Sequence, residues 1–164
     1  MQLELLISPL TKGAYFAQQL EVAAAEFRAH FPQAECHFSG ANQLQWLSTS
    51  LPECDLRQLS RLSFVQGIFE RNEKGIVPLD VASEYGLPEA FVWGNKYRGK
   101  TNELLTQMLL NLALLHCRAT PDKWTVLDPM AGRGTTLLWA ARLGISSYGV
   151  EQDANALEHF IRHC

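Results

Sequence analysis

The sequence predicts a mixed α/β fold in which a small α+β lobe precedes the first part of a Rossmann-like parallel sheet. Three observations lead to this fold class. Short apolar runs ended by proline or by polar turns fill the first half of the 164-residue chain. After residue 100 the pattern becomes helix, strand, glycine-rich loop, helix, strand and helix, which is typical of parallel strands joined by helices. The composition, 47% hydrophobic and 19% charged residues, is that of an ordinary globular protein.

The chain is expected to comprise three segments. Residues 1–85 form the small lobe, residues 86–100 a connector, and residues 101–164 the beginning of a second domain that is incomplete. This length suffices for one ordinary core or for two small lobes, but not for two full domains.

Two elements are predicted at the start of the chain. Residues 3–8 are rich enough in Leu and Ile for a strand, and Pro9, which cannot donate to a strand ladder, ends it. Residues 11–31 carry apolar side chains at approximately helical spacing with no internal proline. A strand followed by an amphipathic helix is therefore expected.

Three further strands and a short helix complete the predicted lobe. Residues 46–51 alternate apolar and polar side chains, as a half-buried strand does. Asp55 is placed to cap a short helix that ends near Leu62. Residues 64–70 and 75–81 then form two strands joined by a polar turn.

The connector, residues 86–100, is expected to lack regular structure because glycines and a proline interrupt it. Arg98 and Lys100 could touch the phosphates of a nucleic acid. Two basic residues in a loop are more often simply solvated, and we favour that interpretation.

A helix over residues 101–117 opens the second domain, with Thr101 as its N-cap and Glu103 in its first turn. Leucines at helical intervals predict that this helix is buried. The other expected elements are a strand over 124–127, a helix over 135–143 ended by Gly144, a strand over 147–151 and a helix from Asp153 onward.

Gly132 and Gly134 lie in the loop between the first of these strands and its helix. Without side chains, they let the backbone approach a ligand closely. A phosphate-binding P-loop requires a lysine directly after its last glycine, and this chain has none there. A dinucleotide-binding loop would prefer Gly or Ala where this chain has the bulky Leu137. Both kinds of phosphate-binding loop are therefore disfavoured.

Two acidic residues lie at the ends of the two predicted strands. Asp128 suits a ligand that carries an ammonium and a sulfonium better than one that carries phosphates. Glu151 lies 23 positions later (151 − 128), close to the interval of ~20 residues at which an acidic residue of a Rossmann domain meets ribose hydroxyls. Carboxylates at two adjacent strand ends would hold opposite ends of one cofactor, and S-adenosylmethionine has the matching chemistry.

The segment Asp128-Pro129-Met130-Ala131-Gly132-Arg133-Gly134-Thr135 resembles the first motif of the amino-methyltransferase branch of the class I S-adenosylmethionine-dependent methyltransferases, which commonly reads Asp-Pro-x-x-Gly-x-Gly-Thr. The segment Tyr97–Glu103 and the leucine-rich helix after it resemble the lead-in of THUMP-associated tRNA guanosine N2-methyltransferases and of a broader set of RNA or DNA methylases. The resemblance covers residues 95–155, approximately.

This resemblance implies which residues line the cofactor. Asp128, Gly132 and Gly134 would lie at its methionine end, Glu151 at its ribose, and the segment Thr101–Glu103 near the methionine tail. The complete cofactor-binding set that we predict is Asp128, Pro129, Ala131, Gly132, Gly134, Thr135, Glu151, Thr101 and Asn102. Arg133 departs from the family, which often has a small or polar residue at its position.

The function that the resemblance implies is transfer of a methyl group to an exocyclic amine of a nucleobase, in tRNA or rRNA ahead of DNA. Enzymes of this family bind the target amine with an Asn/Asp-Pro-Pro-Tyr/Phe tetrapeptide, and these 164 residues contain none. We therefore assign no catalytic residue and expect the chain to be a fragment that is inactive alone. The alternative of another class is a non-catalytic binding or interaction module.

Charge, cysteine content and hydropathy narrow the other choices. A net charge of −3 and a pI of about 5.9 give no global attraction to nucleic acid, so such a contact must be local. The four cysteines form no CxxC pair, which predicts no metal site and reduced thiols in a cytoplasmic protein. No membrane segment is predicted. The exposed edge of a short parallel sheet favours a homo-oligomer.

Overall fold

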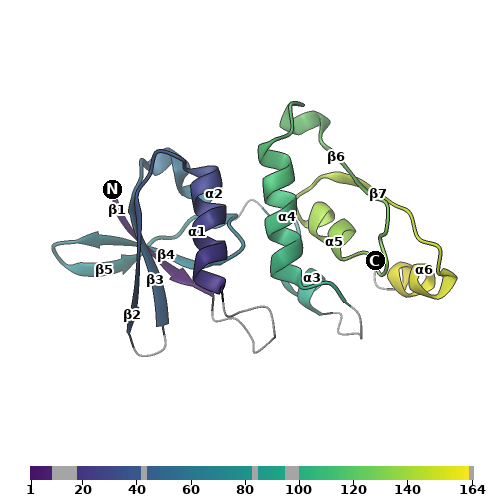
Figure 1. The fold of residues 1–164 in the computed structure, drawn as a ribbon, viewed down its shortest axis with the longest axis horizontal. Helices are drawn as coiled ribbons and strands as arrows, with labels where there is room; N and C mark the ends of the chain where they lie inside the picture. Colours follow the sequence, from purple (N-terminus) through teal and green to yellow (C-terminus); the bar gives the residue numbers. More distant parts are fainter. Residues whose placement is uncertain (9–17, 42–43, 83–84, 95–99, 163–164) are drawn as a thin grey trace. The chain divides into compact units, whose positions relative to one another are not determined.

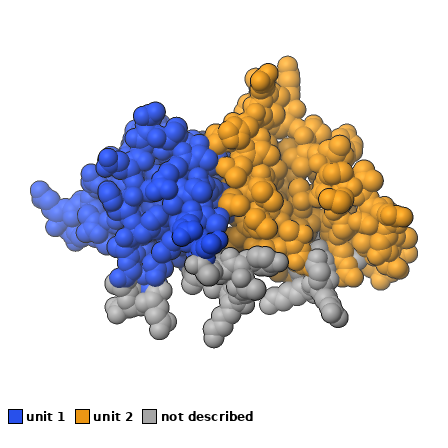
Figure 2. Space-filling view, in the orientation of Figure 1, with its two compact units in different colours: residues 1–83 blue, residues 84–164 orange. Residues whose placement is uncertain are grey.

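The computed structural model describes residues 1–8, 18–41, 44–82, 85–94 and 100–162. The chain is a mixed α/β protein, and its larger sheet is antiparallel. It divides into two compact units, residues 1–83 and 84–164 (Figure 2). Each unit has its own hydrophobic cluster. Within the described residues, no helix combines the length and the apolar character needed to span a bilayer.

The first unit is built on a five-stranded antiparallel sheet (Figure 1). Its described elements are β1 (Gln2–Ile7), α1 (Gln19–His30), β2 (Cys36–Ala41), β3 (Leu44–Ser50), α2 (Leu56–Ser60), β4 (Val65–Asn72) and β5 (Gly75–Pro78). The strands lie in the order β2-β3-β1-β4-β5. Through β4 the connectivity is β-α-β-β-α-β, that of the ferredoxin-like motif.

One face of this sheet forms the core of the first unit. Alternate residues of β1, Leu3, Leu5 and Ile7, are at most 2% exposed, because alternate side chains of a strand point to the same face. Leu5 lies opposite Leu47 of β3, and on its other side opposite residue 68 of β4. Phe27 of α1 is fully buried in the same cluster. α1 therefore covers this face.

The second unit contains a pair of parallel strands joined by a helix. Its described elements are α3 (Ala90–Trp93), α4 (Glu103–Leu115), β6 (Thr125–Asp128), α5 (Thr135–Arg142), β7 (Ser146–Gly149) and α6 (Ala154–Ile161). Leu127 pairs with Tyr148 and Asp128 with Gly149 in the parallel register. Trp139 of α5, 1% exposed, is one of the buried residues of the hydrophobic cluster of this unit.

An aromatic and cationic stack joins α5 to the segment before α3. The guanidinium carbon of Arg142 lies 3.7 Å from the ring centroid of Tyr85 and 5.2 Å from that of Trp139. The Arg142 Nε also donates to the Leu87 carbonyl at 3.2 Å. Burial of this arginine is tolerated because its charge lies over aromatic rings and its donor is bonded.

Several expectations about the elements are corrected. The strand β2 was not expected, and α3 forms where the connector was expected to be irregular. The N-cap of α4 is Asn102, whose Oδ1 accepts from the Leu105 N–H at 2.9 Å, so the prediction of Thr101 is wrong. The start of the helix predicted over residues 11–31 lies outside the described residues.

Lys100 was expected to be solvated, but its side chain is buried. Its side chain is 8% exposed, and its Nζ contacts the Glu103 carboxylate at 2.7 Å and donates to the Val92 carbonyl at 2.8 Å. The ammonium can be buried because both partners are placed to receive it. Arg98, the other basic residue of the connector, lies outside the described residues.

Candidate functional site

The parallel strands β6 and β7 end side by side at one edge of their sheet. Their pairing continues past both strands, because the Val150 N–H donates to the Asp128 carbonyl at 2.8 Å. The Ala131 N–H then donates to the Val150 carbonyl at 2.9 Å. The chain after β6 and the chain after β7 are thereby held against each other. We call residues 129–134 the glycine loop.

The glycine loop turns the chain from β6 into α5. Gly132 has φ +54° and Gly134 has φ +83°, both in the left-handed region that favours glycine. The Gly134 N–H donates to the Ala131 carbonyl at 2.8 Å. Gly134 is also the N-cap residue of α5, and its carbonyl accepts from the Leu138 N–H at 2.9 Å.

A carboxylate ties this loop to the segment after β7. Oε2 of Glu151 accepts from the Gly132 N–H at 2.6 Å, and Oε1 accepts from the Asp153 N–H at 2.7 Å. We call this arrangement the Glu151 clasp. Asp153 is in turn the N-cap of α6, since its Oδ1 accepts from the Asn155 N–H at 2.9 Å. The helix predicted from Asp153 onward is present as α6, which begins at Ala154 directly after this cap.

Asp128 lies at the other side of the loop. Its Oδ1 accepts from the Met130 N–H at 3.0 Å, which fixes the direction of the carboxylate. Within the described part of the chain, no hydrogen bond reaches its Oδ2. Met130 beside it is 85% exposed. The structure thus gives Asp128 a fixed carboxylate with one oxygen left for a further donor.

The two glycines face different surroundings. A Cβ added at Gly134 would collide with the ring of Phe160 from α6. A Cβ added at Gly132 would meet no atom within 4 Å. The close approach that glycine allows is therefore used by Phe160 at position 134, while the space beside Gly132 is open.

The other residues predicted to line the cofactor are placed as follows. Ala131 packs against Gly149, where an added Cβ would lie 2.8 Å from the Ala131 Cβ. Thr135 is buried in the first turn of α5, and Pro129 is exposed. Thr101 is exposed. Among the described residues, no hydrogen bond joins Thr101 or Asn102 to the glycine loop, and the side-chain oxygen of Asn102 caps α4 instead.

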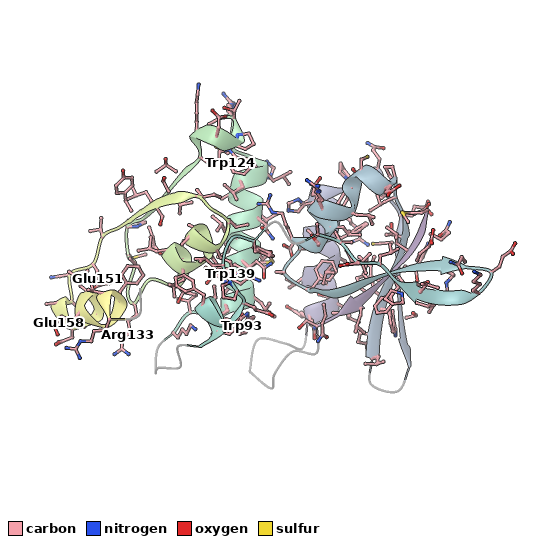
Figure 3. The ribbon with its side chains drawn as sticks, turned by 180° about the vertical axis from the view of Figure 1, so that it is seen from behind. Trp93, Trp124, Arg133, Trp139, Glu151 and Glu158 are labelled. Atoms are coloured by element: carbon pink, nitrogen blue, oxygen red, sulfur yellow. The ribbon has the colours of Figure 1, made fainter. Side chains whose placement is uncertain are left out.

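Sequence reasoning missed the part that α6 plays in the site. Arg133 and Glu151 lie on the same side of the second unit as Glu158 of α6 (Figure 3). Phe160 follows the buried Ala156 by four positions, which places both on one face of α6. This spacing indicated an apolar helix face, but not that the face would lie on Gly134.

Comparison with known proteins adds no relative to this picture: no protein-family model and no curated protein matches the chain. The interpretation of the site therefore depends on its own geometry and on the motif in residues 128–135.

Proposed function

We propose that the glycine loop and the Glu151 clasp bind S-adenosylmethionine, and that the second unit belongs to a methyltransferase that acts on an exocyclic amine of a nucleobase. The observation that carries this proposal is the placement of two carboxylates, Asp128 and Glu151, at adjacent strand ends on either side of an open glycine, Gly132. On this proposal, β6, α5 and β7 are the first β-α-β unit of a Rossmann-like sheet.

The chemistry of the donors fits this cofactor. The Asp128 Oδ2 can accept from an ammonium group, which an amino-acid tail supplies. A carboxylate has about four lone-pair directions, and the clasp uses one on each Glu151 oxygen. The remaining directions can accept from the two hydroxyls of a ribose. Two fixed carboxylates would repel a pyrophosphate, which disfavours a dinucleotide.

Each residue of the site has a positioning role in the proposed reaction. Bound S-adenosylmethionine supplies a methyl group that its sulfonium already activates. Asp128 and Glu151 would fix the two ends of the ligand, so that the methyl group points in one direction. Gly132 would admit the ligand against the backbone. The choice of a nucleobase amine as acceptor, in RNA ahead of DNA, is supported by the motif Asp128–Thr135 alone.

Isothermal titration calorimetry of the full chain tests cofactor binding. We expect a dissociation constant in the micromolar range for S-adenosylmethionine and for its demethylated product, and no heat with NADH. Asp128→Asn keeps the hydrogen bond to the Met130 N–H but removes the charge, and should weaken binding about tenfold. Absence of binding to either ligand would contradict the proposal.

Transfer of a labelled methyl group to total RNA or DNA by the full-length gene product separates the enzyme from the binding module. Label in RNA supports the favoured acceptor, and label in DNA supports the second. Binding of cofactor by the full-length product without transfer to either would favour the binding module.

A further inference from the structure

The sheet of the first unit has a second face, opposite to the one that α1 covers. Leu6 of β1 lies between Trp46 of β3 and Gly67 of β4 in the register. These positions alternate with those that fill the core, so their side chains point the other way. None of them belongs to the hydrophobic cluster of the unit, and neither does Phe69. We call Leu6, Trp46 and Phe69 the open-face patch.

Two aromatic rings from different strands meet on this face. The ring centroids of Trp46 and Phe69 are 5.4 Å apart, and the two ring planes meet at 71°, so the rings pack edge to face. Phe69 leans over Gly67, where an added Cβ would lie 3.1 Å from its ring. Both rings are partly exposed. The absence of a side chain at position 67 therefore lets the Phe69 ring lie along the sheet toward Leu6 and Trp46.

A neutralised carboxylate and an exposed cation border the patch. Glu4 is 4% exposed, and its two oxygens accept from Ser48 Oγ and from Arg71 Nε, each at 2.7 Å. The Arg71 side chain is 55% exposed. In the described part of the chain, its terminal amino groups make no hydrogen bond. The exposed guanidinium of Arg71 can therefore donate hydrogen bonds to an anion, while the carboxylate of Glu4 is buried and paired.

We propose that the open-face patch binds an unpaired stretch of RNA, with bases stacked on Trp46 and Phe69 and a phosphate at Arg71. Aromatic side chains on the exposed face of a four-stranded sheet stack bases in this way, and any base offers a ring face. A protein helix would instead need an apolar groove. The choice of RNA over DNA rests on the proposed function, whereas the stacking of bases on the two rings does not depend on it.

The charge of the chain predicts how such binding responds to salt. With a net charge of −3 and one arginine at the patch, stacking has to supply most of the affinity. The logarithm of the affinity should then fall with the logarithm of the salt concentration with a slope of about −0.7, the value for one phosphate contact on a single strand. A strongly electrostatic binder would show a much steeper slope.

Fluorescence anisotropy of a labelled single-stranded RNA of about eight nucleotides, titrated with the full chain, tests the proposal. Trp46→Ala and Phe69→Ala should each weaken binding roughly 5- to 150-fold, and Trp46→Phe should retain most of it. Tyr148→Ala is the matched control, because it removes an exposed ring of the second unit. Circular dichroism and Tm verify that each variant folds.

The double variant Glu4→Gln/Arg71→Gln removes the arginine without leaving a buried carboxylate unpaired. It should bring the salt slope close to zero, while the losses caused by Trp46→Ala and Phe69→Ala persist.

Three results would overturn the proposal. The first is equal loss of RNA binding in Trp46→Ala and in Tyr148→Ala. The second is no RNA binding by a folded chain, with or without the cofactor. The third is a concentration-dependent dimer that Trp46→Ala abolishes, which would assign the patch to a second copy. Tighter binding of single-stranded DNA than of RNA would overturn the choice of RNA. Calorimetry with S-adenosylmethionine tests the second unit separately, so the two proposals can fail independently.

Discussion

Gly132 and Gly134 both have positive φ, but glycine is needed at the two positions for different reasons. At position 134 the ring of Phe160 fills the space that a side chain would need. At position 132 the space is open, and the N–H is bonded to Glu151. One glycine is thus needed for packing and the other for backbone conformation and access.

Alanine substitutions should separate these two roles. Gly134→Ala adds a collision to the left-handed strain and should destabilise the protein by about 2–5 kcal/mol. Gly132→Ala should cost only about 1–2 kcal/mol in stability, but should weaken S-adenosylmethionine binding at least tenfold because its methyl group enters the open space. Urea denaturation and calorimetry measure the two effects. Equal loss of stability in both variants would contradict this assignment.

Glu151 holds two backbone N–H groups with one carboxylate. Glutamine has a single acceptor oxygen, so Glu151→Gln should leave one of the two N–H groups without an acceptor. We expect a loss of about 1–3 kcal/mol in the free energy of unfolding and weaker cofactor binding. Glu158→Gln is the matched control, because that carboxylate is 66% exposed in a pair with Arg162. The control should change stability by no more than about 1 kcal/mol.

Among the secondary-structure elements, α4 shows most clearly how a local hydrogen bond sets a helix boundary. Thr101 and Asn102 are adjacent, and both residue types cap helices well. The structure uses Asn102, whose Oδ1 accepts from Leu105, while its carbonyl accepts from the Thr106 N–H at 3.0 Å.

Asn102→Ala should therefore destabilise the protein by about 1 kcal/mol. Thr101→Ala should change stability by less than about 0.5 kcal/mol, as expected for an exposed residue without such a contact. Thermal unfolding followed by circular dichroism measures both. A larger effect at Thr101 would show that the helix begins one residue earlier.

Sequence periodicity predicted the positions of most elements, but it missed one strand and did not predict which side chains of each helix are buried. The strand β2 was not predicted because its sequence, Cys-His-Phe-Ser-Gly-Ala, carries none of the β-branched residues that indicate a strand. The leucines of α4 predicted its buried face, yet Leu105 and Leu109 are 45% and 54% exposed. Thr106, Gln107 and Asn111 are buried instead. The Gln107 amide, for example, donates to the Tyr85 hydroxyl at 3.0 Å, and no local pattern reveals a partner 22 positions away.

The candidate site was more accessible to sequence reasoning than these faces. Strand, glycine loop, helix and strand were placed from spacing, since each signal is local. The Glu151 clasp was not predicted, because it joins residues 19 positions apart across two turns. The packing of Phe160 on Gly134 likewise depends on where α6 lies. Contacts of this type follow from the three-dimensional path of the chain.

At the scale of the molecule, the described residues include a largely exposed apolar surface on the parallel strand pair. Leu127 and Tyr148 are register partners and are 65% and 67% exposed. Val150 beyond the strand is 57% exposed. Parallel strands are usually covered on both faces, so a surface of this kind favours association.

Leu127→Glu should therefore reduce self-association of the chain, as measured by sedimentation velocity over a range of concentrations. A carboxylate at the centre of the surface would have to lose its water on association. Val22→Glu is a control that adds the same charge at a 44% exposed position of α1. Equal effects of both changes would mean that added charge alone reduces association.

The Glu151 clasp also makes the site able to report on its own occupancy. The amide hydrogens of Gly132 and Asp153 share one acceptor group, although they belong to separate turns of the backbone. A ligand that holds this carboxylate in place would slow the exchange of both amide hydrogens with solvent. Release of the ligand would let both exchange faster. Ligand binding on one side of the glycine loop would thus be transmitted to the first turn of α6 through a single side chain.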